Sequence, residues 1–186
     1  MTQTHEPMNP STPLGIEYLE KDKLRELLDT YGKLTLTIDG LWIQGVEKRY
    51  GTDACLQIYT EVMEQYGRIQ AHRITRALGI AEGEGDIPAM IAAHNAIPWG
   101  RAVKVNYHQT SDKELVLSIL NCHPQESRKA RGQEIFPCKQ MEHAELAAFF
   151  GQINPRAKVE CLFSPPDERP REVPENVSCQ WKITVE

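Results

Sequence analysis

Four of the five cysteines of this 186-residue chain lie in its C-terminal half, separated by long and irregular spacings. Thiolates bind zinc with tetrahedral geometry, and a thiol whose pKa is lowered can act as a nucleophile. No C-x-x-C pair, the strong sequence signal for zinc, is present. Any shared site must therefore be assembled by the fold. The four residues are Cys122, Cys138, Cys161 and Cys179.

The predicted order of elements brings these cysteines to one end of a sheet. Cys122 follows the second predicted strand, and Cys138 precedes the helix that returns the chain, so both lie at that end. Cys161 lies near the end of the third strand and Cys179 near the start of the fourth, which is the same end. With a near-symmetric hairpin register, these last two would be cross-strand neighbours. We therefore expect the four thiolates to hold a structural zinc ion.

Other interpretations of the cysteines stay open. Three of them could bind zinc together with His123, Glu160 or Asp167, or each could be a separate small core residue. Cys138 could instead be a reactive thiol and a catalytic nucleophile, because a helix N-terminus and the neighbouring Lys139 both lower a thiol pKa. An iron–sulfur cluster is less well supported, because no compact cysteine run is present.

Hydrophobic spacing predicts helices first and strands later. Gly32, Gly51 and Gly79 are expected to end the first three helices, and residues 121–139 are expected to form a loop. This order predicts an α+β fold, with an N-terminal helical bundle packed on a four-stranded, mainly antiparallel sheet in ββαββ order. The predicted helices cover residues 17–31, 34–50, 53–78, 87–97 and 141–151, and the strands cover 102–109, 114–120, 157–163 and 177–185.

The length suits one domain with a real core. Residues 1–15 are polar and proline-bearing and are predicted to form a disordered tail. Residues 16–186 are expected to form a single domain, with a helical half over 16–98 and a sheet half over 101–186. Cys55 falls on the apolar stripe of a predicted helix and is interpreted as a core residue.

Composition disfavours several classes of protein. The net charge is −5, and the one dense basic run is short, which gives no reason to expect nucleic acid as a partner. No apolar segment reaches the roughly 20 residues that span a bilayer, and no signal peptide is recognisable. A cytoplasmic address with reduced thiols is therefore expected. The phosphate-loop, dinucleotide-binding and common hydrolase motifs are absent.

A small-molecule pocket between the helices and the sheet is a second candidate site. Aromatic, acidic and imidazole side chains are suited to line such a pocket, although each alone is more readily explained by a core or surface role. Asp39, before Gly40, is interpreted as a residue that shapes the start of a helix. The candidate ligand-binding residues are Trp42, Glu47, His72, Tyr107 and His108.

Several short motifs together resemble those of an uncharacterised family of small cytosolic proteins of bacteria and archaea, common in anaerobes. The resemblance covers the chain from about residue 35 to its end, and the cysteine motifs are its specific part. The motifs are D-G-L-W-x4-E-x3-G at 39–51, C-x-P-Q-x-x-R at 122–128, F-P-C-K at 136–139, C-x-x-x-P-P-D at 161–167 and C-x-W at 179–181.

More remotely, helices followed by ββαββ resemble the 4-vinyl reductase-type ligand-binding domain and its relatives in trafficking complexes. In some members of that group, cysteines and an acidic residue hold zinc beside a pocket for a small aromatic molecule. A late cysteine pair is also similar to the L-2-amino-thiazoline-4-carboxylic acid hydrolase family. The cysteine spacings differ from those of the sensor domains, so a transcription-factor role is not expected.

Two functional interpretations follow, and a purely structural partner subunit is a third. The first is a small-molecule-binding or sensor-like domain whose cysteine cluster holds a structural zinc ion. The alternative is a metal- or thiolate-dependent hydrolase acting on a small substrate with a C–N or C–S bond. A closed four-thiolate site would favour the first, and an open coordination position the second. A homodimer is also expected, because small sensor-like domains often pair.

Overall fold

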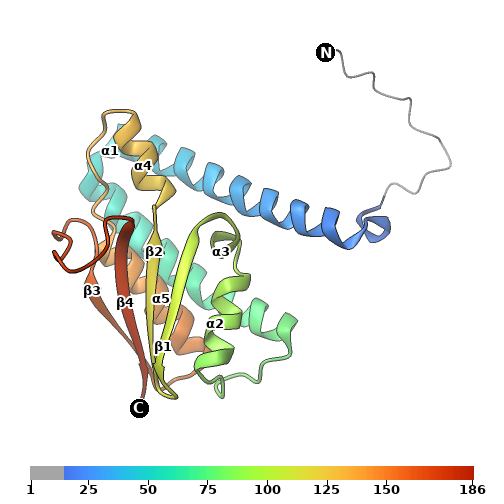
Figure 1. Cartoon of the computed structure of the whole chain (residues 1–186). Coiled ribbons are helices and arrows are strands. Elements are labelled where there is room, and N and C mark those ends of the chain that lie inside the picture. Colours follow the sequence, from blue (N-terminus) through green and yellow to red (C-terminus); the bar gives the residue numbers. More distant parts are fainter. Residues whose placement is uncertain (1–14) are drawn as a thin grey trace, which may run out of the picture.

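The computed structural model describes residues 15–186 (Figure 1). The predicted tail of residues 1–15 lies outside this range, apart from Gly15. In chain order the described elements are a 3-10 turn at Ile16–Tyr18, α1 at Lys21–Leu78, α2 at Ile87–Ala96, α3 at Pro98–Ala102, β1 at Lys104–Ser111, β2 at Glu114–Leu120, α4 at His123–Ala130, α5 at Lys139–Ile153, β3 at Ala157–Phe163 and β4 at Val177–Val185.

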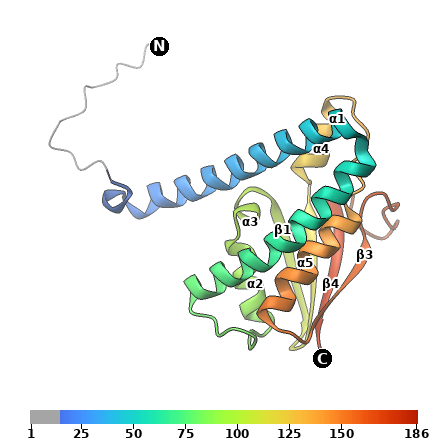
Figure 2. The same ribbon diagram turned by 180° about the vertical axis from the view of Figure 1, so that it is seen from behind.

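The four strands form one antiparallel sheet in the order β1-β2-β4-β3. Figures 1 and 2 show α5 and the C-terminal part of α1 side by side on one face of this sheet, with α2 next to them. The core lies between these layers, because alternate residues of β2 and β4 point to this face and are buried, among them Leu115, Leu117, Trp181 and Ile183. The predicted α+β class is confirmed. Two helices, α4 and α5, separate the two hairpins where ββαββ order has one.

The helix α1 is bent at Gly51, whose backbone angles (φ 82°, ψ 169°) are not helical. A positive φ is accessible to glycine without steric cost. We call residues 21–50 the arm: Figure 1 shows it crossing the molecule at one end of the sheet and extending beyond it, whereas residues 52–78 run along the helical layer. The predicted helix ends at Gly51 and at Gly79, the left-handed C-cap (φ 69°), are both confirmed.

The prediction that a helix ends at Gly32 was wrong. The arm continues through Gly32, which is buried, and a Cβ atom built there would lie 2.5 Å from the carbonyl oxygen of Pro98. The glycine therefore permits the arm to approach α3 closely. An ion pair between Arg101 and Asp29 connects the same two elements.

Alternation of apolar and polar residues predicted the bounds of three strands correctly, since β2, β3 and β4 begin and end as expected. Residues 121–139 were predicted to be loop and contain α4. This helix has Pro124 in its first turn, Glu126 near its start and Arg128 near its end, which suits the helix dipole. Those signals were available in the sequence, but eight mostly polar residues show little hydrophobic periodicity.

The α1–α5 contact generates a first prediction. At Gly67 a Cβ atom would lie 2.6 Å from the backbone oxygen of Glu145, so Gly67→Ala must push α1 and α5 apart. We expect the free energy of unfolding, measured with urea, to fall by roughly 1–3 kcal/mol.

The matched control is Gly151→Ala in α5, where a Cβ atom meets nothing within 4 Å. This substitution should leave stability unchanged or raise it by up to roughly 1 kcal/mol, because alanine favours helix more than glycine does. Equal effects of the two substitutions would contradict the proposed close approach.

Candidate functional site

The cysteine motifs meet where α4, the start of α5 and one end of the sheet come together. Gln125 of α4 donates hydrogen bonds from Nε2 to the carbonyl oxygen of Phe136 (2.8 Å) and to Sγ of Cys138 (3.5 Å), and its Oε1 accepts one from the Phe136 amide (3.1 Å). The amide of Cys122 donates to Oγ of Ser178 at the start of β4 (2.9 Å). Side chains thus connect segments that are far apart in sequence.

The segment after β3 joins the same region. Nζ of Lys139 lies 2.7 Å from Oδ2 of Asp167, and Sγ of Cys138 lies 3.8 Å from Oγ of the fully buried Ser164. The F-P-C-K and C-x-x-x-P-P-D motifs are therefore in direct contact. Asp167 also accepts a hydrogen bond from the Ser164 amide (3.3 Å), which fixes the turn after β3.

Glu142, which was not among the predicted site residues, acts electrostatically on all four thiols. Glu142 is four residues after Cys138 on the same face of α5. Burial raises the pKa of Glu142 to about 7. Burial is the largest cause of the raised pKa of each of the four thiols, and the negative charge of Glu142 is a smaller cause that acts in the same direction. We call these five groups the thiol–carboxyl cluster: Cys122, Cys138, Cys161, Cys179 and Glu142.

Burial has the largest effect on the pKa values of the thiols. It raises the pKa of Cys122 to about 12, that of Cys138 to about 11, and that of Cys179 well above its usual value. The helix N-terminus and Lys139 were expected to lower the pKa of Cys138; burial raises it instead, and Lys139 is paired with Asp167. Without a bound metal ion, pKa values raised in this way keep these groups protonated at neutral pH.

Hydrogen-bond donors nevertheless point at the sulfur atoms. Gln125 and Ser164 lower the pKa of Cys138, although burial outweighs them, and Trp181 acts in the same way on Cys179. The indole nitrogen of Trp181 is buried, and among residues 15–186 no acceptor lies within hydrogen-bond distance of it. Donors of this kind stabilise a thiolate more than a thiol.

The predicted pairing of Cys161 with Cys179 was wrong in detail. Cys161 lies opposite Trp181, and Cys179 lies opposite Ile119 on the other neighbouring strand. The two cysteines are therefore diagonal neighbours, two residues out of register. A bulge between Cys161 and Phe163 lies just beyond this point.

The donor types suit zinc, but their arrangement does not form a metal site. Within residues 15–186 no group of three or more His, Cys, Asp or Glu side chains is placed to hold a metal ion. Of the predicted alternative ligands, Glu160 pairs with Lys182 and Asp167 with Lys139. His123 is exposed at the start of α4. Zinc binding by the cysteines stays a prediction.

Glu142 also lines a narrow cavity of about 10 Å³, room for about one water molecule. Burial raises the pKa of Glu145 well above its usual value, and the charges of Glu142 and Asp39 raise it further. Nε2 of Gln70 donates to Glu145 (3.0 Å), whereas the buried Oε1 of Gln70 has no hydrogen-bond partner in the described part of the chain. The cavity is lined by His94, Ile97, Trp99, Ile119, Glu142, Glu145, Leu146 and Phe149.

His94 and Asp39 are two further polar groups of this region. His94 is buried and stacks on Phe150, its Nδ1 lies 2.7 Å from the hydroxyl of Tyr107, and burial lowers its pKa to about 4. Asp39 accepts a hydrogen bond from the hydroxyl of Tyr59 (2.6 Å), and burial raises the Asp39 pKa. Asp39 thus belongs to this acidic region, in addition to the local role that was expected for it.

The five predicted ligand-binding residues do not come together. Trp42 is 68% exposed on the arm, and His72 is exposed on the C-terminal part of α1. Glu47 forms a bidentate ion pair with Arg128 (2.8 and 2.9 Å). Tyr107 points to the core and bonds His94, whereas its neighbour His108 is exposed on the opposite face of β1. Only Tyr107 lies near the cavity.

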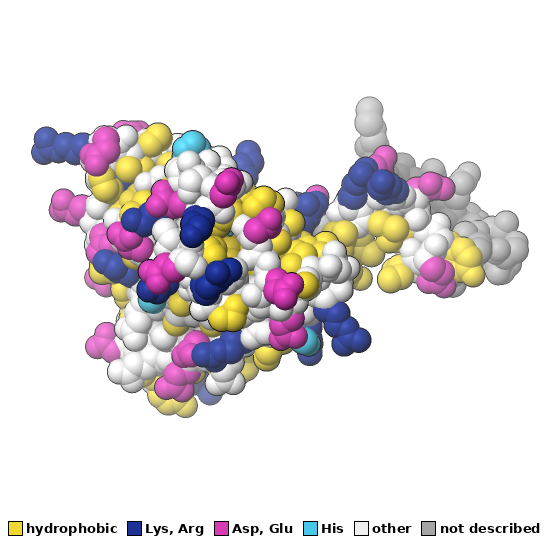
Figure 3. Space-filling model, turned by 90° about the horizontal axis from the view of Figure 1, so that it is seen from below, with side chains coloured by type: hydrophobic (Ala, Val, Ile, Leu, Met, Phe, Trp, Pro, Cys, Tyr) yellow, Lys and Arg dark blue, Asp and Glu magenta, His cyan; other side chains and the backbone are white. Residues whose placement is uncertain are grey.

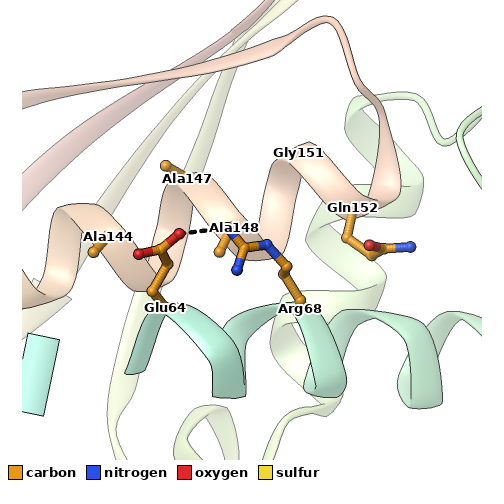
Figure 4. A pocket seen from close by; sticks show the side chains of 7 residues that line it. All are labelled: Glu64, Arg68, Ala144, Ala147, Ala148, Gly151 and Gln152. Atoms are coloured by element: carbon orange, nitrogen blue, oxygen red, sulfur yellow. Dashed lines mark hydrogen bonds and ion pairs between the residues drawn. The ribbon is translucent and has the colours of Figure 1, made fainter. Parts of the chain in front are cut away.

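A second hollow is an open surface groove between α1 and α5. Figure 4 shows that it is bordered by Glu64 and Arg68, which form an ion pair, and by small residues of α5 that include Ala144 and Gly151. It contains no thiol, and its carboxyl group, that of Glu64, is paired with Arg68. The thiol–carboxyl cluster and its cavity are therefore the candidate functional site.

The comparison with known families fits this assembly of motifs. The family model described as "Family of unknown function (DUF6125)" matches residues 17–185. The chain belongs to this family. No curated protein matches the chain. Membership in DUF6125 supports the expected uncharacterised family. None of the helices that the structure describes in this DUF6125 chain combines the length and apolar character needed to cross a bilayer.

Two key acidic residues of the DUF6125 chain could have been found from spacing. Glu142 and Glu145 follow Cys138 by four and seven residues, so all three lie on one helical face. That face also carries Leu146 and Phe149, which are buried. An acidic residue on the apolar face of a helix is a signal for a functional carboxyl group.

The pKa values generate a second prediction. Because burial keeps Cys122, Cys138 and Cys179 protonated at pH 7, native protein should react with iodoacetamide at least roughly tenfold more slowly than unfolded protein. Intact-mass spectrometry after timed labelling measures the rate.

An exposed thiol introduced at the β1–β2 turn by Asp112→Cys is the positive control. Labelling of Cys138 as fast as this control would contradict the protonated-thiol assignment. A second contradicting result would come from metal analysis: one zinc ion per chain in the wild type, and none in Cys138→Ser or Cys179→Ser. Sulfur that binds zinc is deprotonated, so such a result would exclude protonated thiols.

Proposed function

We propose that this chain is a small-molecule-binding domain whose site is the cavity beside the thiol–carboxyl cluster. The single observation that carries the proposal is the carboxyl pair of Glu142 and Glu145. Both pKa values are raised by burial, and within residues 15–186 neither group forms an ion pair with a lysine or arginine. Buried carboxyl groups without a basic partner are costly and are frequent at functional sites.

The chemistry of the lining favours a small organic cation as the ligand. Glu142 and Glu145 supply negative charge, and Asp39 adds to it. Trp99 offers an aromatic face, on which an ammonium group is stabilised. His94 is neutral and does not repel a cation. A bound amine would lower the pKa of both glutamates and relieve their mutual repulsion.

The space now open is smaller than an amine, so binding requires movement of a wall. The arm contacts this region through Asp39, which accepts a hydrogen bond from the hydroxyl of Tyr59. Small displacements of such a contacting element open and close ligand sites in many proteins. The cysteines would form one side of the opened site.

A hydrolase remains a second candidate because of one pair of residues. Glu142, with a pKa near 7, is one helical turn from Cys138 and has the proton affinity of a general base. It could deprotonate the thiol for attack on a small substrate with a C–N or C–S bond. Rapid alkylation of Cys138 that disappears in Glu142→Gln would favour this candidate over the binding domain.

The carboxyl pair generates a prediction about pH. The pKa of Glu142 is higher in the folded protein (about 7) than its ordinary 4.5, so the folded state binds the proton more tightly. The stabilisation is complete below pH 4.5 and is lost as pH rises to about 7. The Glu142→Gln variant has no carboxyl group to ionise, so its stability should not fall in this way. At pH 8 it should be more stable than the wild type by up to about 3 kcal/mol.

Urea unfolding at pH 4.5, 6 and 8 measures the difference. His94 acts in the opposite direction in both proteins, because its lowered pKa makes stability fall as pH drops from 6.5 to about 4. This contribution cancels in the comparison. Glu61→Gln, an exposed carboxyl group on α1, should follow the wild type at all three values. Parallel curves for wild type and Glu142→Gln would contradict the assignment.

Ligand class is tested with matched probes at pH 8: butylamine and benzylamine as cations, butyrate as the anion and butyramide as the neutral form. At ten times the dissociation constant, a bound amine should raise Tm by about 3–6 °C. Butyrate and butyramide should have no effect. Glu142→Gln and Glu145→Gln should abolish the response to amines, because they remove the charge that binds the ligand, and Glu61→Gln should retain it.

A response to butyrate equal to that of butylamine would contradict the cationic ligand. No response to any probe, with Glu142→Gln still showing its raised stability at pH 8, would assign the carboxyl pair to a role other than amine binding.

A further inference from the structure

The arm carries an apolar face that no described part of the chain covers. Its inner side packs against α3 at Gly32 and against the core at Leu36. On the outer side, apolar residues recur at alternating spacings of three and four. We call these residues the arm stripe: Leu24, Leu27, Tyr31, Leu34, Ile38 and Leu41.

The spacing is that of the a and d positions of a heptad repeat, whose residues bury themselves against a second helix. Tyr31, Leu34, Ile38 and Leu41 are between 51% and 60% exposed, which is unusual for consecutive positions of one seam. Figure 3 shows hydrophobic side chains along the arm where it extends from the body of the molecule. An apolar seam of this regularity indicates a partner helix.

The exposed area is close to what a stable dimer needs. Leu28 and Trp42 flank the stripe and are 55% and 68% exposed. With roughly 200 Å² for each large residue, these two and the four exposed stripe residues offer about 700 Å². A stable interface buries about 800 Å² per partner. The half-buried Leu24 and Leu27 supply most of the remainder.

We propose that the arm stripe binds the arm stripe of a second copy of this chain, with the two arms antiparallel. An isologous two-fold contact of this kind is the commonest in homo-oligomers. In the antiparallel register each large residue faces another. Leu24 lies opposite Leu41 of the second copy, Leu27 opposite Ile38, and Tyr31 opposite Leu34.

The positions that flank the seam favour this arrangement. Thr30 and Thr37 of the two copies would lie opposite each other and carry no charge. On the other side Lys21 would lie against Trp42 of the second copy, where its ammonium group is attracted to the indole ring. Parallel arms would place Thr37 beside Trp42 and lose this contact. No like charges meet along the seam.

The first test is the oligomeric state of the full chain, measured by sedimentation equilibrium. The wild type should be a dimer at micromolar concentration. Leu34→Glu places a charge in the seam of each arm and should weaken association at least roughly 100-fold without lowering Tm of the monomer, because Leu34 is 56% exposed. The matched control, Ile69→Glu, changes another exposed apolar residue (47% exposed) on the other half of α1 and should remain dimeric.

The second test fixes the direction of the arms. Under mild oxidation the double variant Thr30→Cys/Thr37→Cys should form a disulfide between chains, whereas Thr30→Cys/Thr35→Cys should not. A monomeric wild type, or a dimer that Leu34→Glu leaves intact, would overturn the proposal. So would a monomer that dimerises only when residues 2–14 are removed, since that segment would then be the occupant of the stripe.

Discussion

The bidentate ion pair between Glu47 and Arg128 is the contact on which the geometry of this molecule depends. The two side chains are only 17% and 10% exposed, so the pair is protected from water and its geometry is fixed by two parallel hydrogen bonds. Glu47 also accepts a hydrogen bond from Thr52, on the other side of the bend at Gly51. One carboxylate therefore holds both sides of the bend and attaches them to α4.

This attachment has consequences on each side. Arg128 donates to the carbonyl oxygen of Glu134 and lies over the ring of Phe136, so it also orients the segment that leads to Cys138. The arm is held across the end of the sheet where Asp39 meets Tyr59. Glu47, which the sequence suggested as a ligand-binding residue, is thus the structural connection between the arm and the cysteine motifs.

Sequence patterns predicted the fold where the determinants were local. Strand alternation located β2, β3 and β4, and the glycines at 51 and 79 ended helices because their backbone conformation required it. Gly32 was misread because its role is a contact with Pro98, far away in the chain, which spacing does not reveal. The short polar helix α4 was missed because it has almost no hydrophobic period.

The sequence argument expected the four cysteines at one end of the sheet, and the structure connects the segments of Cys122, Cys138 and Ser164 with Ser178 by hydrogen bonds. The strand register, which separates Cys161 from a direct partner in Cys179, depends on the loop and on a bulge that the sequence does not specify. The charge state of the thiols could not be predicted from the sequence, because the desolvation of each thiol depends on how several elements pack around it. His94 could not be assigned to the site from the sequence either, because its contacts are with Tyr107 and Phe150, which are distant from it along the chain.

The three tryptophans occupy three different physical environments. Trp42 is largely exposed on the arm, Trp99 lines the cavity, and Trp181 is fully buried beside Cys179. Indole emission shifts to shorter wavelength as the ring loses contact with water, and an aqueous quencher reaches only exposed rings. Single-tryptophan versions of the chain would therefore carry separate optical reporters of the arm, the cavity and the centre of the sheet, without any added label.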